Sequence, residues 1–225
     1  MRSASRTISA LLLAVAVDLA AAAPVKPVVP CDRPVYVFGG GQVAGVGVRD
    51  PGKNDFATRI DTFFTRVCGH EVRFEVVTEE GGRVVPAAAT IAGTIARNPR
   101  SIAFVHFPVS DVENGASVDA LLDAYRWILD ACTKTGSTCI IGGQTPVNAF
   151  NQAQSDRQLE VEHRAAAVFG SSYLPLYRYF QSESSRRRLM LPVDAGDGRL
   201  VDDIGHELLF NIYRRRLLET TGARR

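Results

Sequence analysis

"PVYVFGGGQVAGVGVRD", residues 34–50, places three consecutive glycines directly after a short apolar run. The run "PVYVF" has the composition of a strand that is buried in a parallel sheet. Glycines at the end of such a strand permit a sharp turn and let a ligand or another backbone segment approach closely. In α/β proteins this place holds either a phosphate-binding turn or a catalytic nucleophile, so the segment bears on both fold and function.

Apolar runs and helical periods alternate along the rest of the chain. Further strands are expected at 71–78, 101–107 and 137–145, and helices at 54–68, 86–97, 117–132, 155–168 and 202–219. The first helix has an apolar face formed by Phe56, Ile60, Phe63, Phe64 and Val67. Ser117 is expected to cap the helix that it precedes. This alternation predicts an α/β fold in which helices cover both faces of a parallel sheet.

The N-terminus has the pattern of a secretory signal peptide. "MRSASR" carries two arginines, and the apolar run "TISALLLAVAV" is too short to span a bilayer. The alanines at 20–23 supply a small-residue cleavage pattern. We therefore expect a signal peptide at 1–22, an extended lead-in at 23–33 and a single domain at 34–225. The mature protein is expected to be secreted or periplasmic, without a stable membrane span.

The charge pattern argues against a nucleic-acid partner. The chain has a formal net charge of +2 at pH 7, so it has no strong global field that would attract a polyanion. Two "RRR" runs, at 186–188 and 214–216, are interpreted as solvated loop and helix-end charges.

Four cysteines in an exported chain indicate disulfides. Cys132 and Cys139 flank the polar segment "TKTGST", so we pair them with each other. Cys31 and Cys68 then pair by elimination and because they lie near the first strand and the first helix. The chain has neither a C-x-x-C motif nor a close histidine cluster, so no metal site is predicted, and no cofactor is expected.

Polar and glycine residues follow each predicted strand, in the segments "GGGQ", "TEEGGR", "PVSD" and "GGQTP". Ligands of open α/β sheets gather at these carboxyl ends. The candidate ligand-binding residues are Gly39, Gly40, Gly41, Gln42, Arg83, Ser110, Asp111 and Gln144. The glycines either admit a ligand to the backbone or only preserve a turn geometry, and both interpretations stay open.

A dinucleotide turn is one alternative. Gly39, Gly41 and Ala44 satisfy the pattern G-x-G-x-x-A, which would make the chain a nucleotide-binding protein. In that fold a helix begins within the glycine turn and holds the pyrophosphate. Here "GVGVRDPGKND" separates the glycines from the first predicted helix, which weakens this interpretation.

The opening block of the SGNH, or GDSL-like, hydrolases is an apolar strand followed by Gly-Asp-Ser-Leu, and "VYVFGGGQVAGVG" resembles it except at the reactive positions. Gly39, Gly40 and Gly41 take the places of that family's glycine, aspartate and nucleophilic serine. Gly82 is similar to the glycine of the second block.

Two later segments extend the resemblance. "PVSD" (108–111) aligns with the third block, Gly-x-Asn-Asp, which puts Pro108 and Ser110 at the glycine and asparagine positions. "DGRLVDDIGH" has the spacing of the last block, with Asp197 matching the catalytic aspartate and Leu200 in the catalytic histidine position. The resemblance implies a three-layer α/β/α sandwich with a flavodoxin-like sheet.

The same resemblance implies a dismantled active site. Glycine at 41 removes the nucleophile, leucine at 200 removes the base, and Pro108 and Ser110 alter the oxyanion donors. The expected activity is binding, with an unknown saccharide, acyl ligand or envelope protein as partner.

An active ester or acetyl hydrolase with a reassigned nucleophile is the other alternative. Ser110 and Thr145 are the hydroxyl candidates, although both are interpreted as polar loop residues. His206 with Asp203 could supply a substitute base.

The other polar residues have structural interpretations. His106 is expected to be a satisfied core residue, and His70 and His163 surface or helix-end residues. Asp197, Asp202 and Asp203 are expected to form a solvated turn that caps a helix.

Overall fold

A five-stranded parallel sheet forms the centre of the computed structural model, which describes residues 28–107, 109–187 and 200–222. Its strands are β1 (Val35–Gly39), β2 (Phe74–Thr78), β3 (Ile102–His106), β4 (Thr138–Gly142) and β5 (Tyr173–Leu174). They follow the order β2-β1-β3-β4-β5, and every pairing is parallel. This order confirms the flavodoxin-like sheet.

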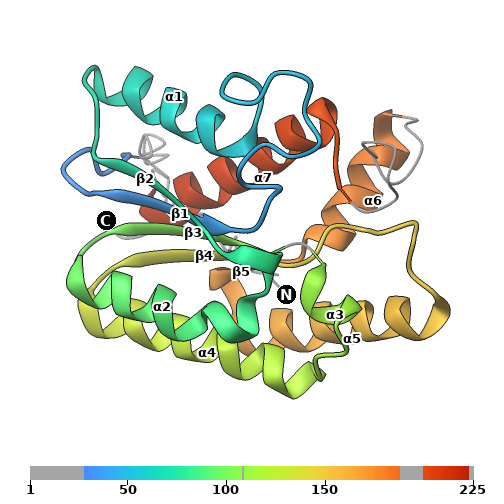
Figure 1. The fold of residues 1–225 in the computed structure, drawn as a ribbon. Helices are drawn as coiled ribbons and strands as arrows, with labels where there is room; N and C mark the ends of the chain where they lie inside the picture. Colours follow the sequence, from blue (N-terminus) through green and yellow to red (C-terminus); the bar gives the residue numbers. More distant parts are fainter. Residues whose placement is uncertain (1–27, 108, 188–199, 223–225) are drawn as a thin grey trace, which may run out of the picture.

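Helices cover both faces of the sheet (Figure 1). One face carries α1 (Phe56–Cys68), α6 (Leu176–Arg187) and α7 (Asp203–Gly222), and the other carries α2 (Val84–Arg97), α4 (Val118–Thr135) and α5 (Gln152–Phe169). Three short helical segments lie in the loops: η1 (Glu80–Gly82), α3 (Ser110–Glu113) and η2 (Gly170–Ser172). The three-layer α/β/α architecture is thereby confirmed.

Two apolar cores form because side chains alternate across each strand. In β1, Val35 and Val37 pack toward α1 and α7, whereas Tyr36 and Phe38 pack toward α2 and α4. β1, β3 and β4 are buried over their whole length, which explains their continuous apolar sequences. The edge strand β2 is partly exposed.

Local sequence signals set several helix ends. Asp55 caps α1 by accepting a hydrogen bond from the Thr58 N–H at 2.8 Å, and the predicted cap Ser117 accepts from the Ala120 N–H at 3.1 Å. Asn151 and Gln154 form a capping box at the start of α5. One expectation for α1 was wrong, because Val67 is exposed on its outer side.

Several predicted boundaries also differ from the structure. The strand expected at 71–78 begins at Phe74, and α2 begins two residues before its predicted start. α4 continues to Thr135, so Cys132 lies inside the helix and not at the edge of a turn. The prediction omitted α3, β5 and α6, which are short or lack a strong apolar period.

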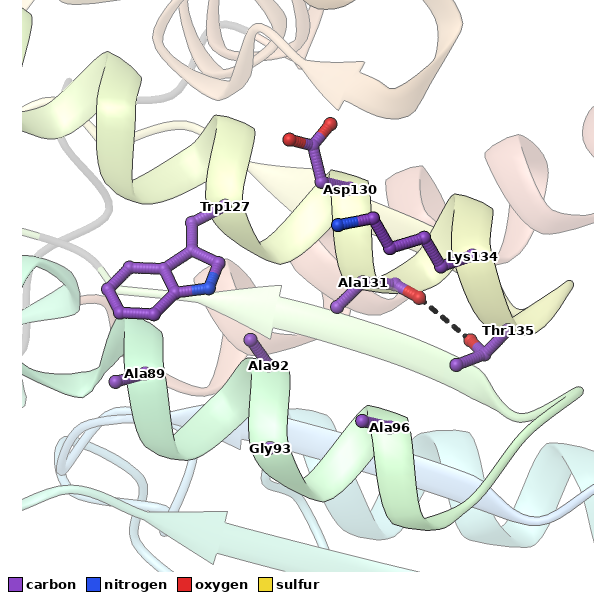
Figure 2. Close-up of a pocket in the computed structure, with 9 residues that line it drawn as sticks. All are labelled: Ala89, Ala92, Gly93, Ala96, Trp127, Asp130, Ala131, Lys134 and Thr135. Carbon is purple, nitrogen blue, oxygen red and sulfur yellow. Dashed lines mark hydrogen bonds between the residues drawn. The ribbon is translucent and has the colours of Figure 1, made fainter.

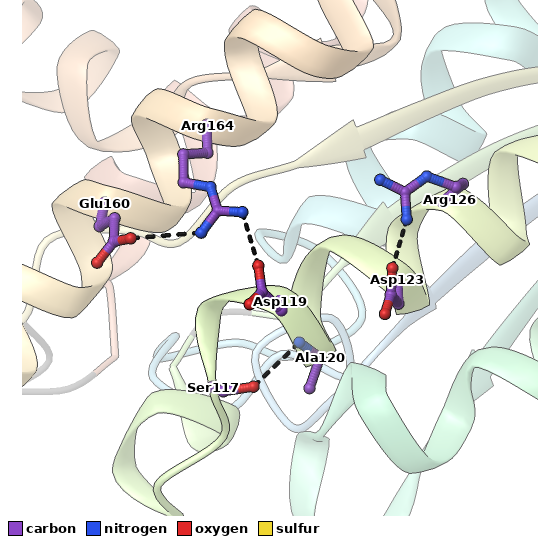
Figure 3. A network of polar contacts seen from close by, with 7 residues as sticks. All are labelled: Ser117, Asp119, Ala120, Asp123, Arg126, Glu160 and Arg164. Atoms are coloured by element: carbon purple, nitrogen blue, oxygen red, sulfur yellow. Dashed lines mark hydrogen bonds and ion pairs between the residues drawn. The ribbon is translucent and has the colours of Figure 1, made fainter.

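Polar contacts join α4 and α5 at the surface (Figure 3). Arg164 of α5 pairs with Asp119 of α4 at 2.6 Å and with Glu160 at 3.4 Å. Asp123 and Arg126 form a second pair within α4. Exposed pairs of this kind contribute only about 0–1 kcal/mol each, so the apolar cores carry most of the stability.

Both predicted disulfides are present. Cys31–Cys68 joins the segment before β1 to the end of α1, and Cys132–Cys139 joins α4 to β4. Residues 1–27 lie outside the described part of the chain, so the signal peptide and its cleavage stay predictions. None of the described helices is both long and apolar enough to cross a membrane.

A buried carboxyl group lies beneath the end of β4. Glu162 is 6% exposed and accepts hydrogen bonds from the Tyr173 hydroxyl at 3.2 Å and the Arg178 N–H at 3.3 Å. Burial raises the pKa of Glu162 to about 7, against the opposing effect of these hydrogen bonds and of the Arg178 charge.

Removal of the Cys31–Cys68 disulfide is expected to destabilise the protein more than removal of Cys132–Cys139. The two bonds span 37 and 7 residues, and loop-closure entropy gives about 4 and about 2.5 kcal/mol respectively. Urea unfolding of C31A/C68A and C132A/C139A measures the order. A larger loss in C132A/C139A would contradict it.

The contribution of Glu162 to the stability of the protein is expected to fall as the pH rises from about 4.5 to about 7, because the folded state favours its protonated carboxyl group. A shift of this size corresponds to about 3 kcal/mol. Glu162→Gln should abolish the part of the pH dependence of the unfolding free energy that Glu162 causes. Glu160→Gln, the control at an exposed position of the same helix, should leave that pH dependence unchanged. Urea unfolding between pH about 5 and about 8 tests this, and parallel profiles for all three proteins would refute it.

Candidate functional site

The loops that follow β1 and β2 meet backbone to backbone. A side chain at Gly40 would place its Cβ 2.6 Å from the Gly82 Cα. Gly82 has a φ of +57°, and a Cβ there would lie 3.4 Å from the Ser110 Oγ. Three of the candidate positions, Gly40, Gly82 and Ser110, therefore lie together at the carboxyl end of the sheet.

Gly41 is exposed at the tip of this turn. Its carbonyl accepts a hydrogen bond from the Val46 N–H at 2.9 Å, and its φ is not positive. A Cβ at this position would lie 3.1 Å from the Cγ2 of Val46, an exposed side chain that has room to move. The turn can therefore accommodate a serine.

The glycine turn is not the start of a helix. Residues 41–47 form successive turns, and the first helix begins only at Phe56. A dinucleotide turn needs helical N–H groups at the glycines to hold a pyrophosphate. The structure therefore gives the nucleotide interpretation no support.

The donors and acceptors around Ser110 are largely engaged. The Gly82 N–H donates to the Glu79 carbonyl at 3.0 Å, so it is not free to stabilise an oxyanion. Ser110, expected in a loop, is the half-buried first residue of α3. Pro108 lies outside the described residues.

Asp111 was expected to contact a ligand, but it has a structural role instead. Its buried carboxylate accepts from the Val84 N–H at 2.6 Å and from the Val85 N–H at 3.2 Å, which satisfies the start of α2. Burial raises the pKa of Asp111, while these bonds and the charge of Arg83 lower it. Arg83 itself is exposed beside the turn.

Beneath the turn lies a set of buried polar side chains. The His106 Nε2 is 3.3 Å from the Gln42 Oε1, and neither residue is exposed by more than 1%. The pKa of His106 is lowered to about 3, mainly by burial and to a smaller extent by the electrostatic effect of His206. This imidazole is therefore neutral. It is a core histidine as expected, but its Nδ1 has no hydrogen-bond partner among the described residues.

Gln144 and Thr145, after β4, are buried as well. The Thr145 carbonyl accepts from the Gln158 Nε2 at 2.6 Å, while within the described part of the chain the Thr145 hydroxyl and the Gln144 Oε1 have no partner. Thr145 lies in a loop, as expected, but it is buried there. Neither side chain is accessible at the surface as a nucleophile or ligand contact.

His206 is buried at the start of α7, and its Nδ1 accepts a hydrogen bond from the Phe56 N–H at 3.0 Å. A neutral imidazole that accepts at Nδ1 carries its proton on Nε2 and has no lone pair left for a second proton. Burial lowers the pKa of His206, opposed by the Val46 carbonyl and the charge of Asp55. His206 is thus a packing residue.

His206 and Asp203, the pair proposed as a substitute base, form no hydrogen bond with each other in the described structure. The Asp203 carboxylate accepts from the Arg49 N–H at 3.1 Å and pairs with the Arg49 guanidinium at 3.7 Å. Asp202 accepts from the N–H groups of Ile204 and Gly205, which confirms the capping interpretation for this residue.

The remaining predicted positions are Leu200, Asp197, His70 and His163. Leu200 is half-buried, and Asp197 lies outside the described residues. His70 contacts the Glu71 carbonyl at the opposite end of α1, and His163 borders a depression between α5 and α6. Among the described residues, no cluster of histidine, cysteine, aspartate and glutamate is arranged to hold a metal.

A shallow pocket of about 380 Å³ lies on the outer side of α2 and α4 (Figure 2). Small residues of α2, including Ala89, Ala92 and Gly93, line it beside Trp127, which is 56% exposed. Sequence reasoning did not single out this pocket, because a tryptophan in an amphipathic helix indicates core packing as readily as exposure. It contains none of the candidate residues.

The sequence matches no protein-family model and no curated protein at a significant level. Solved structures nevertheless share its fold. TesA superposes with a TM-score of 0.64 at 12% identity, over 82% of this chain and 98% of TesA. A member of the lipolytic G-D-S-L family from Veillonella parvula gives 0.62 at 14% identity, over 81% and 97% of the two chains. AlinE4, an SGNH-hydrolase family esterase, gives 0.52 at 17%, over 72% and 84%. The protein therefore has the fold of the SGNH hydrolase structures.

Proposed function

We propose that this SGNH-fold protein binds an acyl ester at the glycine turn and does not hydrolyse it. One observation carries the proposal: no imidazole of the chain is placed to act as a base at Gly41. The position that aligns with the nucleophilic serine has no hydroxyl, so both reacting groups of a serine hydrolase are missing.

The four histidines are each committed elsewhere. His206 presents its lone pair to the Phe56 N–H, and His106 is buried with a pKa far below neutrality. His70 and His163 lie at other places on the surface. A general base must reach the proton that it removes, and none of these groups combines access with a free lone pair at the turn.

The turn retains features of a carbonyl-binding surface. Gly41 is exposed and lacks a side chain, so an ester group can approach its backbone. The exposed Arg83 guanidinium and the half-buried Ser110 hydroxyl offer donors to a carbonyl oxygen or to the hydroxyls of an acylated saccharide. The names of the similar structures, a lipolytic protein and an esterase, support an acyl ligand.

Export is part of the proposal. Two disulfides are typical of oxidising compartments, and the N-terminal sequence has the pattern of a signal peptide. The ligand would then be an acylated component of the cell envelope.

The unmodified protein is expected to hydrolyse p-nitrophenyl acetate no faster than buffer containing an inert protein. The physical reason is the absence of both a nucleophile and an accessible base. Release of nitrophenolate in proportion to protein concentration, abolished by Ser110→Ala or Thr145→Val, would instead identify an active hydrolase with a reassigned nucleophile.

A fluorophosphonate probe should label G41S/L200H and leave the unmodified protein unlabelled, because the paired changes restore a hydroxyl and an imidazole at the aligned positions. Mass spectrometry of the labelled peptide is expected to locate the adduct at residue 41. A44S/L200H is the matched control, since Ala44 is exposed in the same turn, and it should stay unlabelled. Labelling of the unmodified protein would overturn the proposal.

A further inference from the structure

A pocket of about 270 Å³ between α1 and α7 is lined by cationic and aromatic side chains: Lys53, Arg59, Thr62, Phe63, Arg66, Phe210 and Arg214. Its lining includes four basic residues and no carboxylate. It shares no residue with the glycine turn, so its function is independent of the one proposed for that turn.

Helical spacing builds the pocket. Arg59, Phe63 and Arg66 recur at intervals of four and three residues, which puts them on one side of α1. Phe210 and Arg214 are one turn apart on α7, which continues to Gly222. Arg214 is exposed, as expected for a solvated charge, but it lies within the helix and not at its end.

Aromatic contacts hold the two helices together at this place. The Phe63 and Phe210 rings meet edge to face with centroids 6.2 Å apart. The Arg214 guanidinium lies over the Phe210 ring, 5.3 Å from its centroid. The rings give the pocket an apolar wall beside its cationic rim.

The arginines of the pocket are not neutralised by the protein. Within the described part of the chain, Arg59, Arg66 and Arg214 form no ion pair, and the Arg59 Nε donates only to the Asn54 carbonyl, at 2.8 Å. Lys53 pairs with Asp50 at 2.8 Å.

α1 supplies little negative charge to balance the arginines of the pocket. Asp61 is the one carboxylate of α1, and burial, followed by the charge of Glu71, raises its pKa. Like charges that share a pocket repel one another, so an anion placed among them would relieve an unfavourable interaction.

We propose that this pocket binds a phosphate group carried on an apolar chain. Guanidinium groups form paired hydrogen bonds with phosphate oxygens, and a dianionic group matches three unpaired positive charges better than a carboxylate does. The phenylalanine wall would contact the apolar chain. The phosphate could belong to a free phosphomonoester or to a lipid headgroup.

Calorimetric titration with octyl phosphate, below the concentration at which it forms micelles, tests the proposal. Octyl phosphate should bind more tightly than inorganic phosphate, and uncharged octyl glucoside should not bind. R66Q/R214Q should weaken octyl phosphate binding by about tenfold or more, since it removes two charge-assisted contacts. R66K/R214K, which keeps the charge and loses the planar fork, should be intermediate.

R97Q/R157Q is the matched control, because it removes two charges from the opposite helical layer and should leave the affinity unchanged. R66Q/R214Q should unfold at the same or a higher urea concentration than the parent, since it relieves repulsion. If octyl phosphate gives no binding heat at millimolar concentration and the vesicles below are not bound, the proposal is overturned. Equal binding by parent and R66Q/R214Q also overturns it.

Sedimentation with vesicles identifies the source of the phosphate. Binding to vesicles that contain phosphatidic acid but not to phosphatidylcholine vesicles, lost in R66Q/R214Q, assigns the site to the phosphomonoester headgroup of a lipid. Binding of octyl phosphate without vesicle binding assigns it to a soluble phosphomonoester. Vesicle binding that R66Q/R214Q leaves unchanged places the contact elsewhere and contradicts the proposal.

Discussion

The burial of β1, β3 and β4 over their whole length is the constraint on which the rest of the structure depends. A strand with apolar residues on both faces needs a helical layer on each side, and parallel pairing needs a crossover between successive strands. The two cores, one under α1 and α7 and the other under α2, α4 and α5, satisfy this requirement. They also direct every strand-end loop to one edge, where the candidate site lies.

At that edge, several polar groups form hydrogen bonds within the protein and are not free to bind a ligand. The Gly82 N–H is used within its own turn, Asp111 satisfies the start of α2, and His206 accepts from the Phe56 N–H. A serine hydrolase keeps the corresponding donors and lone pairs free for the reacting atoms. Gly40 and Gly82 bring two loops into close contact, and neither glycine has a side chain that could bind a ligand. In this protein those groups are engaged by the fold, while the backbone at Gly41 is exposed.

The two surfaces for which we propose ligands differ in how far the sequence alone predicts them. The glycine turn is contiguous, so its position after a strand can be recognised without a structure. The cationic pocket brings Arg66 together with Arg214, residues that lie on the first and last helices. Only the packing of α1 against α7, which includes the contact of Phe63 with Phe210, makes them neighbours, and no local sequence pattern indicates that packing.

The sequence by itself determined the α/β class, the alternation of strands and helices, both disulfide pairings and the location of the glycine turn. The class, the alternation and the turn depend on residue composition and periodicity over short windows, and the Cys31–Cys68 pairing follows by elimination once Cys132 and Cys139 are paired. Only the tertiary structure decided which polar groups are free: Thr145 is buried, Asp111 faces α2, and His206 and Asp203 have separate partners. The physical reason is that hydrogen-bond partners at a strand edge come from segments far apart in the chain, and their pairing is set by packing and not by neighbouring residues.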